Sequence, residues 1–284
     1  MLLSKPRQRR CNRCKGAVTM KLILCNGVQA NVTQLAALAS VNYGHFTTLQ
    51  VRGAAVRGLK LHLCRLQRAT QHLFGSRLDI AALRAQLYDG LAAFCQTDAS
   101  LRITVYATEF DFRAPLRPVS VDTLLAISSP SVLPTVAVRV CSVPFVRSLP
   151  DLKHVGTFPQ FALRRDALAA GFDDALFVHD DGRLLEGTFW NVGFWDGKCV
   201  TWPEGPALAG TQQALLRVGL EQLGVPQIVQ PLRHADLGRF VAAFLCNARG
   251  QQPLSAIDDH LYSVSEAPMA LLECALATQS WQSL

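Results

Sequence analysis

The pattern of apolar and polar positions in the first half of the chain predicts a mixture of strands and helices. Short runs rich in β-branched and aromatic residues, broken by Gly or Asn, are typical of strands. The predicted strands are residues 21–29, 46–56, 101–110 and 123–129. Within residues 59–75, Leu61, Leu66 and Leu73 recur at roughly a helical period, and the closing glycine suits a C-cap. Residues 80–96 predict a second helix, so this half indicates a small mixed α/β unit.

Short strands dominate the second half and are joined by turns such as DDG and WDG. The predicted strands are residues 135–143, 174–181, 191–195, 198–202 and 240–247. Residues 211–224 predict a helix because four leucines form an apolar stripe along them. These leucines are Leu215, Leu216, Leu220 and Leu223. Residues 266–277 predict a C-terminal helix.

A stretch punctuated by four prolines, between residues 115 and 134, separates the two halves and has the composition of a connection. We therefore expect an α+β protein with two domains. The predicted divisions are a basic tail over residues 1–19, a small α+β domain over 20–115, a connection over 116–134 and a larger domain over 135–284.

Composition adds that the chain is globular. Half of its 284 residues are apolar, which is enough for one large core or two smaller ones. No apolar run reaches the ~18 to 20 residues that a membrane span needs, so we expect no membrane association. The nine cysteines are scattered along the chain, unlike a secreted disulfide framework. A reducing compartment, the cytoplasm, is the predicted location.

The positive charge is concentrated at the start of the chain. Thirteen Lys and Arg precede Asp79, the first acidic residue, and six of them lie in residues 1–15. Such asymmetry can indicate that a protein binds nucleic acid, but a loose basic tail also binds anions without specificity. We do not expect a nucleic-acid partner. Cys11 and Cys14 have CxxC spacing without a second pair that would complete a zinc site. No metal is predicted.

Two ionisable side chains stand in apolar surroundings. Glu186 lies in LLEGTFWNVGFW, where an unpaired carboxylate would be costly, so we expect a cation or a protonated nitrogen opposite it. Lys153 lies in RSLPDLKHVGTF, in a chain that has only six lysines. A partly desolvated lysine has a lowered pKa and can attack carbonyl groups. An ordinary surface lysine would fit the composition as well.

Five short motifs follow one another in a characteristic order. They are HxxRL at His62–Leu66, RxxPxxK at Arg147–Lys153, ExxxxN at Glu186–Asn191, LAGTQ at Leu208–Gln212 and CNARGQQP at Cys246–Pro253. Each motif is weak alone, but the succession resembles the class IV aminotransferase family, the pyridoxal phosphate enzymes of fold type IV. The resemblance covers nearly the whole chain from about residue 20. It implies a small mixed α/β domain, a larger β-barrel-like domain with helices, and a homodimer.

The resemblance also implies roles for individual residues. Lys153 would form the aldimine with pyridoxal 5'-phosphate and then move the substrate proton. Glu186 would face the pyridine nitrogen, and Arg65 would hold the phosphate together with the backbone at the start of the predicted helix. Further cofactor contacts are expected from Asn191, Gly210, Thr211, Gln212 and Asn247. Tyr43, Thr48 and Arg113 are the expected substrate-binding residues.

The reaction within the family stays open at this point. GHFTTLQV, the histidine after Lys153 and CNAR are similar to the aminodeoxychorismate lyases. The stretch YATEFDFRAP departs from them, because Glu109 and Asp111 stand near the place where an arginine would receive a substrate carboxylate, with Arg113 as a substitute. We favour amino-group transfer from an amino acid to a 2-oxo acid. The alternatives are an elimination that gives 4-aminobenzoate and pyruvate, and an anion- or nucleic-acid-binding protein without turnover.

Overall fold

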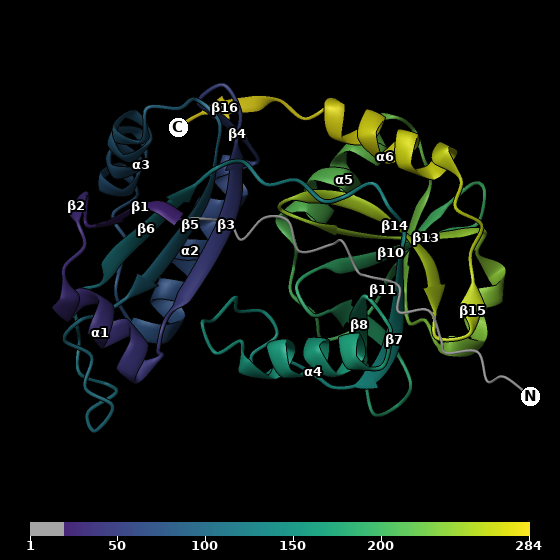
Figure 1. The fold of residues 1–284 in the computed structure, drawn as a ribbon, viewed down its shortest axis with the longest axis horizontal. Coiled ribbons are helices and arrows are strands. Elements are labelled where there is room, and N and C mark those ends of the chain that lie inside the picture. The colour runs from purple at the N-terminus through teal and green to yellow at the C-terminus, as the bar shows by residue number, and fades with distance from the viewer. Residues whose placement is uncertain (1–19) are drawn as a thin grey trace, which may run out of the picture.

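The computed structural model describes residues 20–284 and divides them visibly into two units (Figure 1). The N-terminal unit is built on an antiparallel five-stranded sheet in the order β2-β1-β6-β5-β3. Its strands are β1 (Met20–Cys25), β2 (Val28–Gln29), β3 (His45–Val51), β5 (Ala99–Tyr106) and β6 (Asp122–Ser128). The predicted tail over residues 1–19, with its CxxC pair, lies outside the described residues.

Helices α2 (Leu59–Phe74) and α3 (Ile80–Phe94) pack on this sheet, and α1 (Val32–Val41) lies at its edge. The buried face of α2 carries leucines and also His62, whose Nδ1 lies 2.7 Å from Thr47 Oγ1 on β3. Gly90 lets α3 approach the sheet, because a β-carbon there would lie 2.8 Å from the side chain of Leu125. Every second residue of β5, namely Leu101, Ile103 and Val105, lies in one buried cluster with leucines of α2 and α3, so one face of the sheet lies under these helices.

The C-terminal unit is a closed barrel. Strand β10 pairs with both β9 and β13, and the ring continues through β14, β7 and β8 back to β9. The six strands are β7 (Val138–Pro144), β8 (Asp174–Val178), β9 (Leu184–Gly187), β10 (Asn191–Trp195), β13 (Ala242–Asn247) and β14 (Gly250–Ile257). Short strands β11 (Val200–Pro203), β12 (Gln227–Gln230) and β15 (His260–Leu261) and the 3-10 helix η1 (His234–Arg239) extend it.

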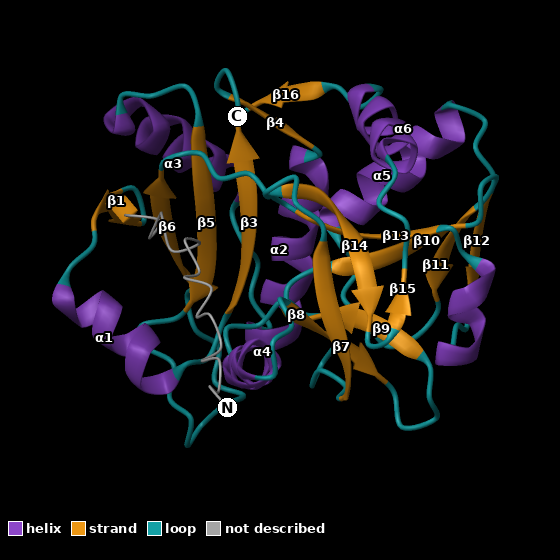
Figure 2. Ribbon diagram, turned by 45° about the vertical axis from the view of Figure 1, so that its right-hand side comes forward, coloured by secondary structure: helices purple, strands orange, loops and turns teal. Residues whose placement is uncertain are grey.

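Three helices cover the barrel (Figure 2). Helices α5 (Thr211–Gln222) and α6 (Glu266–Ala277) pack against one another and against the β13 side, while α4 (Phe158–Ala169) packs on β7 and β8. Strand β16 (Trp281–Ser283) then leaves the barrel and pairs with β4 (Ala55–Arg57) of the N-terminal unit. The last strand of the chain therefore ties the two units together. None of the helices within residues 20–284 is long and apolar enough to cross a membrane.

The predicted α+β class with a barrel-like second half is confirmed, and the structure corrects several local predictions. Helices α1 and α4 were not predicted. In α2, Leu61 is 38% exposed, and the buried stripe runs instead through positions such as Leu59, Leu63 and Leu66. Leu223 at the end of α5 is also exposed. The predicted domain limits stay a prediction. The pairing of β16 with β4 brings the end of the chain back to the N-terminal unit.

Candidate active site

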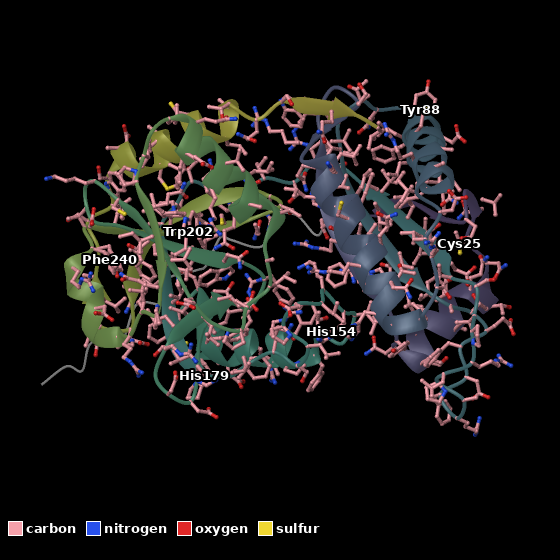
Figure 3. All side chains as sticks on the ribbon, turned by 180° about the vertical axis from the view of Figure 1, so that it is seen from behind. Cys25, Tyr88, His154, His179, Trp202 and Phe240 are labelled. Carbon is pink, nitrogen blue, oxygen red and sulfur yellow. The ribbon has the colours of Figure 1, made fainter. Side chains whose placement is uncertain are left out.

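Lys153 lies where the two units meet. Its backbone carbonyl accepts a hydrogen bond of 2.8 Å from the Phe46 amide, and His154 forms a bridge with His45, so the lysine segment docks on the free edge of β3. His154 lies between the two units in Figure 3, and its Nε2 is 2.9 Å from the Ser148 carbonyl. The backbone thus holds Lys153 at a fixed place between the sheet and the barrel.

The ammonium group of Lys153 is surrounded by other cations. Its Nζ lies 4.9 Å from the centroid of the Phe46 ring. The pKa of Lys153 is lowered to about 7, first by burial and then by the positive charges of Arg65 and Arg147, while Glu186 opposes the shift. Within residues 20–284, no hydrogen bond or ion pair of Nζ offsets this loss of solvation. The amine is therefore largely neutral slightly above neutral pH.

Glu186 lies in β9 and is only 5% exposed. Its Oε1 is 3.5 Å from Nη1 of Arg147, which is 7% exposed. Burial raises the pKa of Glu186, and the charge of Arg147 opposes the rise. The cation expected opposite this carboxylate is therefore present within the chain itself.

Arg147 also shapes the segment that presents Lys153. Its guanidinium donates to the carbonyls of Leu152 at 2.7 Å and Pro150 at 3.2 Å. One buried side chain thus joins the turn before Lys153 to Glu186 on β9. The sequence motif RxxPxxK contained Arg147, but no role was predicted for it. Its signal was an arginine six positions before the lysine in apolar surroundings.

Asn191 lies beside Glu186 in the barrel wall, because the two residues are register partners on β10 and β9. Its Nδ2 donates to the Leu208 carbonyl at 2.9 Å, and this bond holds the loop before α5. Gly210 ends that loop at the N-cap of α5, where an added β-carbon would overlap the Asn191 side chain. Arg65, half-buried on α2, donates to the Ala209 carbonyl. Several predicted residues therefore converge on one loop.

The first turn of α5 presents two further predicted residues. Thr211 and Gln212 are both buried, and the side-chain amide of Gln212 donates to Gln251 Oε1 at 3.3 Å. Asn247 lies at the end of β13, where its Oδ1 accepts from the Arg249 amide at 2.9 Å. Its side chain thus closes its own turn, so a cofactor contact from it stays a prediction.

The predicted substrate-binding residues differ in their surroundings. Thr48 is half-buried in β3, on the side of the strand that also carries Phe46. Tyr43 stacks on Phe110 and donates to the Leu73 carbonyl at 3.0 Å. Arg113 is exposed in the loop between β5 and β6, with its guanidinium over Phe112. The substrate role of each stays a prediction.

Arg102 is a cation of the site that sequence reasoning missed. It lies on β5 opposite Thr48, and its guanidinium carbon is 3.5 Å from the centroid of the Phe46 ring. Burial lowers the pKa of Arg102 to about 10. Among the described side chains, only Thr104 accepts a hydrogen bond from it, at 3.4 Å, and no carboxylate pairs with it. The strand pattern gave no reason to separate this arginine from an exposed one.

A small cavity of about 20 Å³ brings the central groups together. Lys153, Glu186 and Arg147 line it, together with Phe46 and the side of α4 at Gln160. Lys153 and the buried carboxylate of Glu186 thus line the same cavity. Within residues 20–284, no group of three or more His, Cys, Asp or Glu side chains is arranged to hold a metal ion.

Comparisons with known proteins agree on a family. The model of the amino-transferase class IV family matches residues 44–257. Among solved structures, 4-amino-4-deoxychorismate lyase from Pseudomonas aeruginosa is 27% identical, with a TM-score of 0.77, covering 89% of this chain and 97% of that one. A search of curated proteins returned no match.

Two more distant structures share the fold. A branched-chain aminotransferase from the thermophilic archaeon Thermoproteus uzoniensis, with norvaline, is 19% identical with a TM-score of 0.80, covering 90% of this chain and 94% of that one. A hypothetical aminotransferase from Mycobacterium tuberculosis, in its PLP-bound form, is 18% identical with a TM-score of 0.74, covering 90% and 98%. From the family match over most of its length, the chain belongs to the class IV aminotransferases, a family of pyridoxal phosphate-dependent enzymes.

Proposed function

We propose that this enzyme takes the amino group from a carboxylate-bearing primary amine and transfers it to a 2-oxo acid. The observation that carries the proposal is the pairing, in one cavity, of a lysine with a strongly lowered pKa and a buried carboxylate. Perturbed ionisable groups in a cleft are typical of catalytic sites. The amine of Lys153 has the protonation state needed for both nucleophilic attack and proton transfer near neutral pH.

The residues present fit pyridoxal 5'-phosphate. When bound, this cofactor supplies an aldehyde that reacts with amines and a ring that accepts electrons from a substrate carbanion. Arg65 and the start of α5 at Thr211 are a guanidinium and a helix N-terminus, which suit a phosphate dianion. Gly210 leaves no room for a side chain in this loop. Glu186 is buried in the same cavity as Lys153, and a carboxylate there favours a protonated ring nitrogen.

Arg102, rather than Arg113, is the better partner for a substrate carboxylate. Arg65, Arg102 and Arg147 are all close enough to lower the pKa of Lys153, and Glu186 is the acid that opposes them. A phosphate dianion offsets part of this excess positive charge. Arg102 keeps an unpaired guanidinium beside Phe46 and Lys153, so an anionic substrate group completes the charge balance there.

A second reaction is favoured by one specific observation. The structure with 27% identity, aligned over 97% of its length, is an aminodeoxychorismate lyase. Removal of a proton from the substrate α-carbon is common to both reactions. Elimination of a leaving group, giving 4-aminobenzoate and pyruvate, then replaces amino transfer. Arg102 serves either reaction, because both substrates carry carboxylates.

Product analysis separates these outcomes. The cofactor-loaded enzyme is incubated with aminodeoxychorismate and, separately, with L- and D-amino acids plus 2-oxoglutarate or pyruvate. New amino acid in the second set supports amino transfer, and aminobenzoate with pyruvate in the first supports elimination. A colourless protein that does not retain pyridoxal phosphate and turns over none of these compounds would contradict both.

The carboxylate assignment has its own test. We expect Arg102→Gln to raise KM for the productive substrate about tenfold or more, the loss of a charge-assisted hydrogen bond, with a smaller change for Arg102→Lys. Arg113→Gln is the matched comparison, because that side chain is exposed. A raised KM in Arg113→Gln with an unchanged Arg102→Gln would reverse the assignment.

We also propose a cytoplasmic homodimer. The seven described cysteines are all free, which suits a reducing compartment. Phe158 and Phe161 on α4 are 79% and 59% exposed. The ring centroid of Phe161 lies 4.9 Å from that of Phe189, which lines the Lys153 cavity. An apolar helix face beside the site suits contact with a second copy. Sedimentation equilibrium tests this, and a monomer at micromolar concentration would contradict it.

A further inference from the structure

A second, larger cavity of about 190 Å³ lies between the two units, towards the far end of β3 from Lys153. Both units line it, and so does the last strand of the chain through Trp281. Three arginines face it, namely Arg52, Arg57 and Arg249. Among the described residues that line the cavity, none is acidic.

The three arginines are not paired with acids elsewhere in residues 20–284. The side-chain hydrogen bonds of Arg52 and Arg249 go to the backbone carbonyls of Val51 and Val132. Arg57 lies with its guanidinium carbon 4.6 Å from the centroid of the Trp281 ring. Burial lowers the pKa of Arg57 and of Arg249. Three cations that share one cavity repel one another unless an anion joins them.

Two buried donors point to the same conclusion. Nε of Arg57 and Nε2 of Gln50 are buried without a hydrogen-bond partner, and both side chains line the cavity. The amide oxygen of Gln50 is already engaged by Ser100 and Ser131, which fixes the orientation of the amide. Buried donors without acceptors are uncommon, and each costs about 1 to 3 kcal/mol. A ligand with several acceptor oxygens in the cavity would bring acceptors close to both side chains.

We propose that this cavity binds an oxyanionic group of a small molecule, a carboxylate or a phosphate. Guanidinium groups bind planar carboxylates and phosphates in a bidentate manner, and the absence of an acid among its described lining residues favours an anion. The anion is either the distal carboxylate of the substrate or a free oxyanion. The first source rests on the proposed function, and the second does not.

The cavity adjoins the expected cofactor groups and shares two of them. Thr211 and Gln212 line its inner side, whereas Lys153, Glu186 and Arg65 do not line it. An anion held by Arg57 and Arg249 would therefore lie next to the expected position of the cofactor phosphate. The site is thus predicted to bind its anion while the cofactor is in place.

Direct binding tests the free-anion source. Cofactor-loaded full-chain protein is titrated with inorganic phosphate by calorimetry, at an ionic strength held constant with chloride. We expect saturable binding that weakens about tenfold in Arg249→Gln and in Arg57→Gln. Replacement of Arg57 can disturb the pairing of β16 with β4. Arg249 is exposed, so its replacement should leave the fold intact and still test the site. Arg217→Gln is the control, because this exposed residue lies on α5 and does not line the cavity.

Steady-state kinetics test the substrate source. We expect Arg249→Gln to raise KM about tenfold for a dicarboxylic amino substrate and to leave KM for a monocarboxylic one unchanged. Either phosphate binding that depends on the arginines or this selective change in KM supports the proposal. The proposal is overturned if neither occurs, and also if phosphate binds only the cofactor-free protein, because the anion then occupies the cofactor phosphate site. An enzyme inactive on every amine but with arginine-dependent phosphate binding would refute the proposed function alone.

Discussion

Replacement of Arg147 by methionine tests the role of the buried ion pair. The substitution removes a cation that is 7% exposed, leaves Glu186 buried at 5% exposure, and deprives the carbonyls of Pro150 and Leu152 of donors. Removal of one partner from a buried pair costs about 3 to 5 kcal/mol. The 3.5 Å separation is long for such a pair, so we expect about 3 kcal/mol in the free energy of unfolding.

Urea unfolding of the cofactor-free protein measures this loss. Arg164→Met is the matched control, because Arg164 also lies 3.5 Å from a carboxylate, that of Asp174, but its side chain is 45% exposed. Exposed pairs contribute about 0 to 1 kcal/mol. Equal destabilisation by the two substitutions, or an Arg147→Met variant as stable as the wild type, would refute the reasoning.

The stability of Arg147→Met should also depend on pH, and the direction of this dependence can be predicted. Burial raises the pKa of Glu186, and without Arg147 the rise is larger. The folded state then binds a proton that the unfolded state has released above its own pKa of about 4.5. Stability of the variant therefore falls as the pH rises from that value through the raised folded pKa. Adding Glu186→Gln should remove this slope and recover part of the stability, which a double-mutant cycle measures.

The remaining predictions concern the lysine and two glycines. Since the pKa of Lys153 is about 7, the rate of pyridoxal phosphate uptake by the cofactor-free enzyme should rise with pH through about 7 and then level off, and a rise that continues to about 10 would contradict it. Gly210→Ala should weaken cofactor retention about tenfold, measured by dialysis, because its β-carbon overlaps a neighbouring side chain. Gly219→Ala should cost about 1 to 3 kcal/mol in urea, because its β-carbon overlaps the backbone of Ala275, whereas Gly238→Ala, with open space around it, should not destabilise the protein.

Local patterns in the sequence were enough for most elements of the fold. The β-branched and aromatic residues of 101–110 and the leucine stripe in 211–224 gave β5 and α5 with starts close to those observed. Helix α4 was missed because its apolar residues Phe158 and Phe161 are largely exposed, so no buried stripe marks it. Closure of the barrel was implied only by the family resemblance, because pairing between β9 and β10 is a tertiary property.

The candidate site could be predicted where function dictates residue type along the chain. Lys153 and Glu186 carry recognisable motifs, and the structure brings them to one cavity. Arg102 could not be proposed from the sequence, because the feature that marks it is its position beside Phe46 on a neighbouring strand, and not its neighbours in sequence. Arg113 was chosen on sequence proximity to a family position, which does not reveal exposure.

The most direct test of the account is to identify the residue that holds the cofactor. The purified protein is loaded with pyridoxal phosphate, reduced with borohydride and digested, and the modified peptide is sequenced by mass spectrometry. We predict an absorbance band in the region of about 400 nm that reduction bleaches, with the label on Lys153. A label on Lys198 or on another lysine, or retention of the band in Lys153→Ala, would contradict the account.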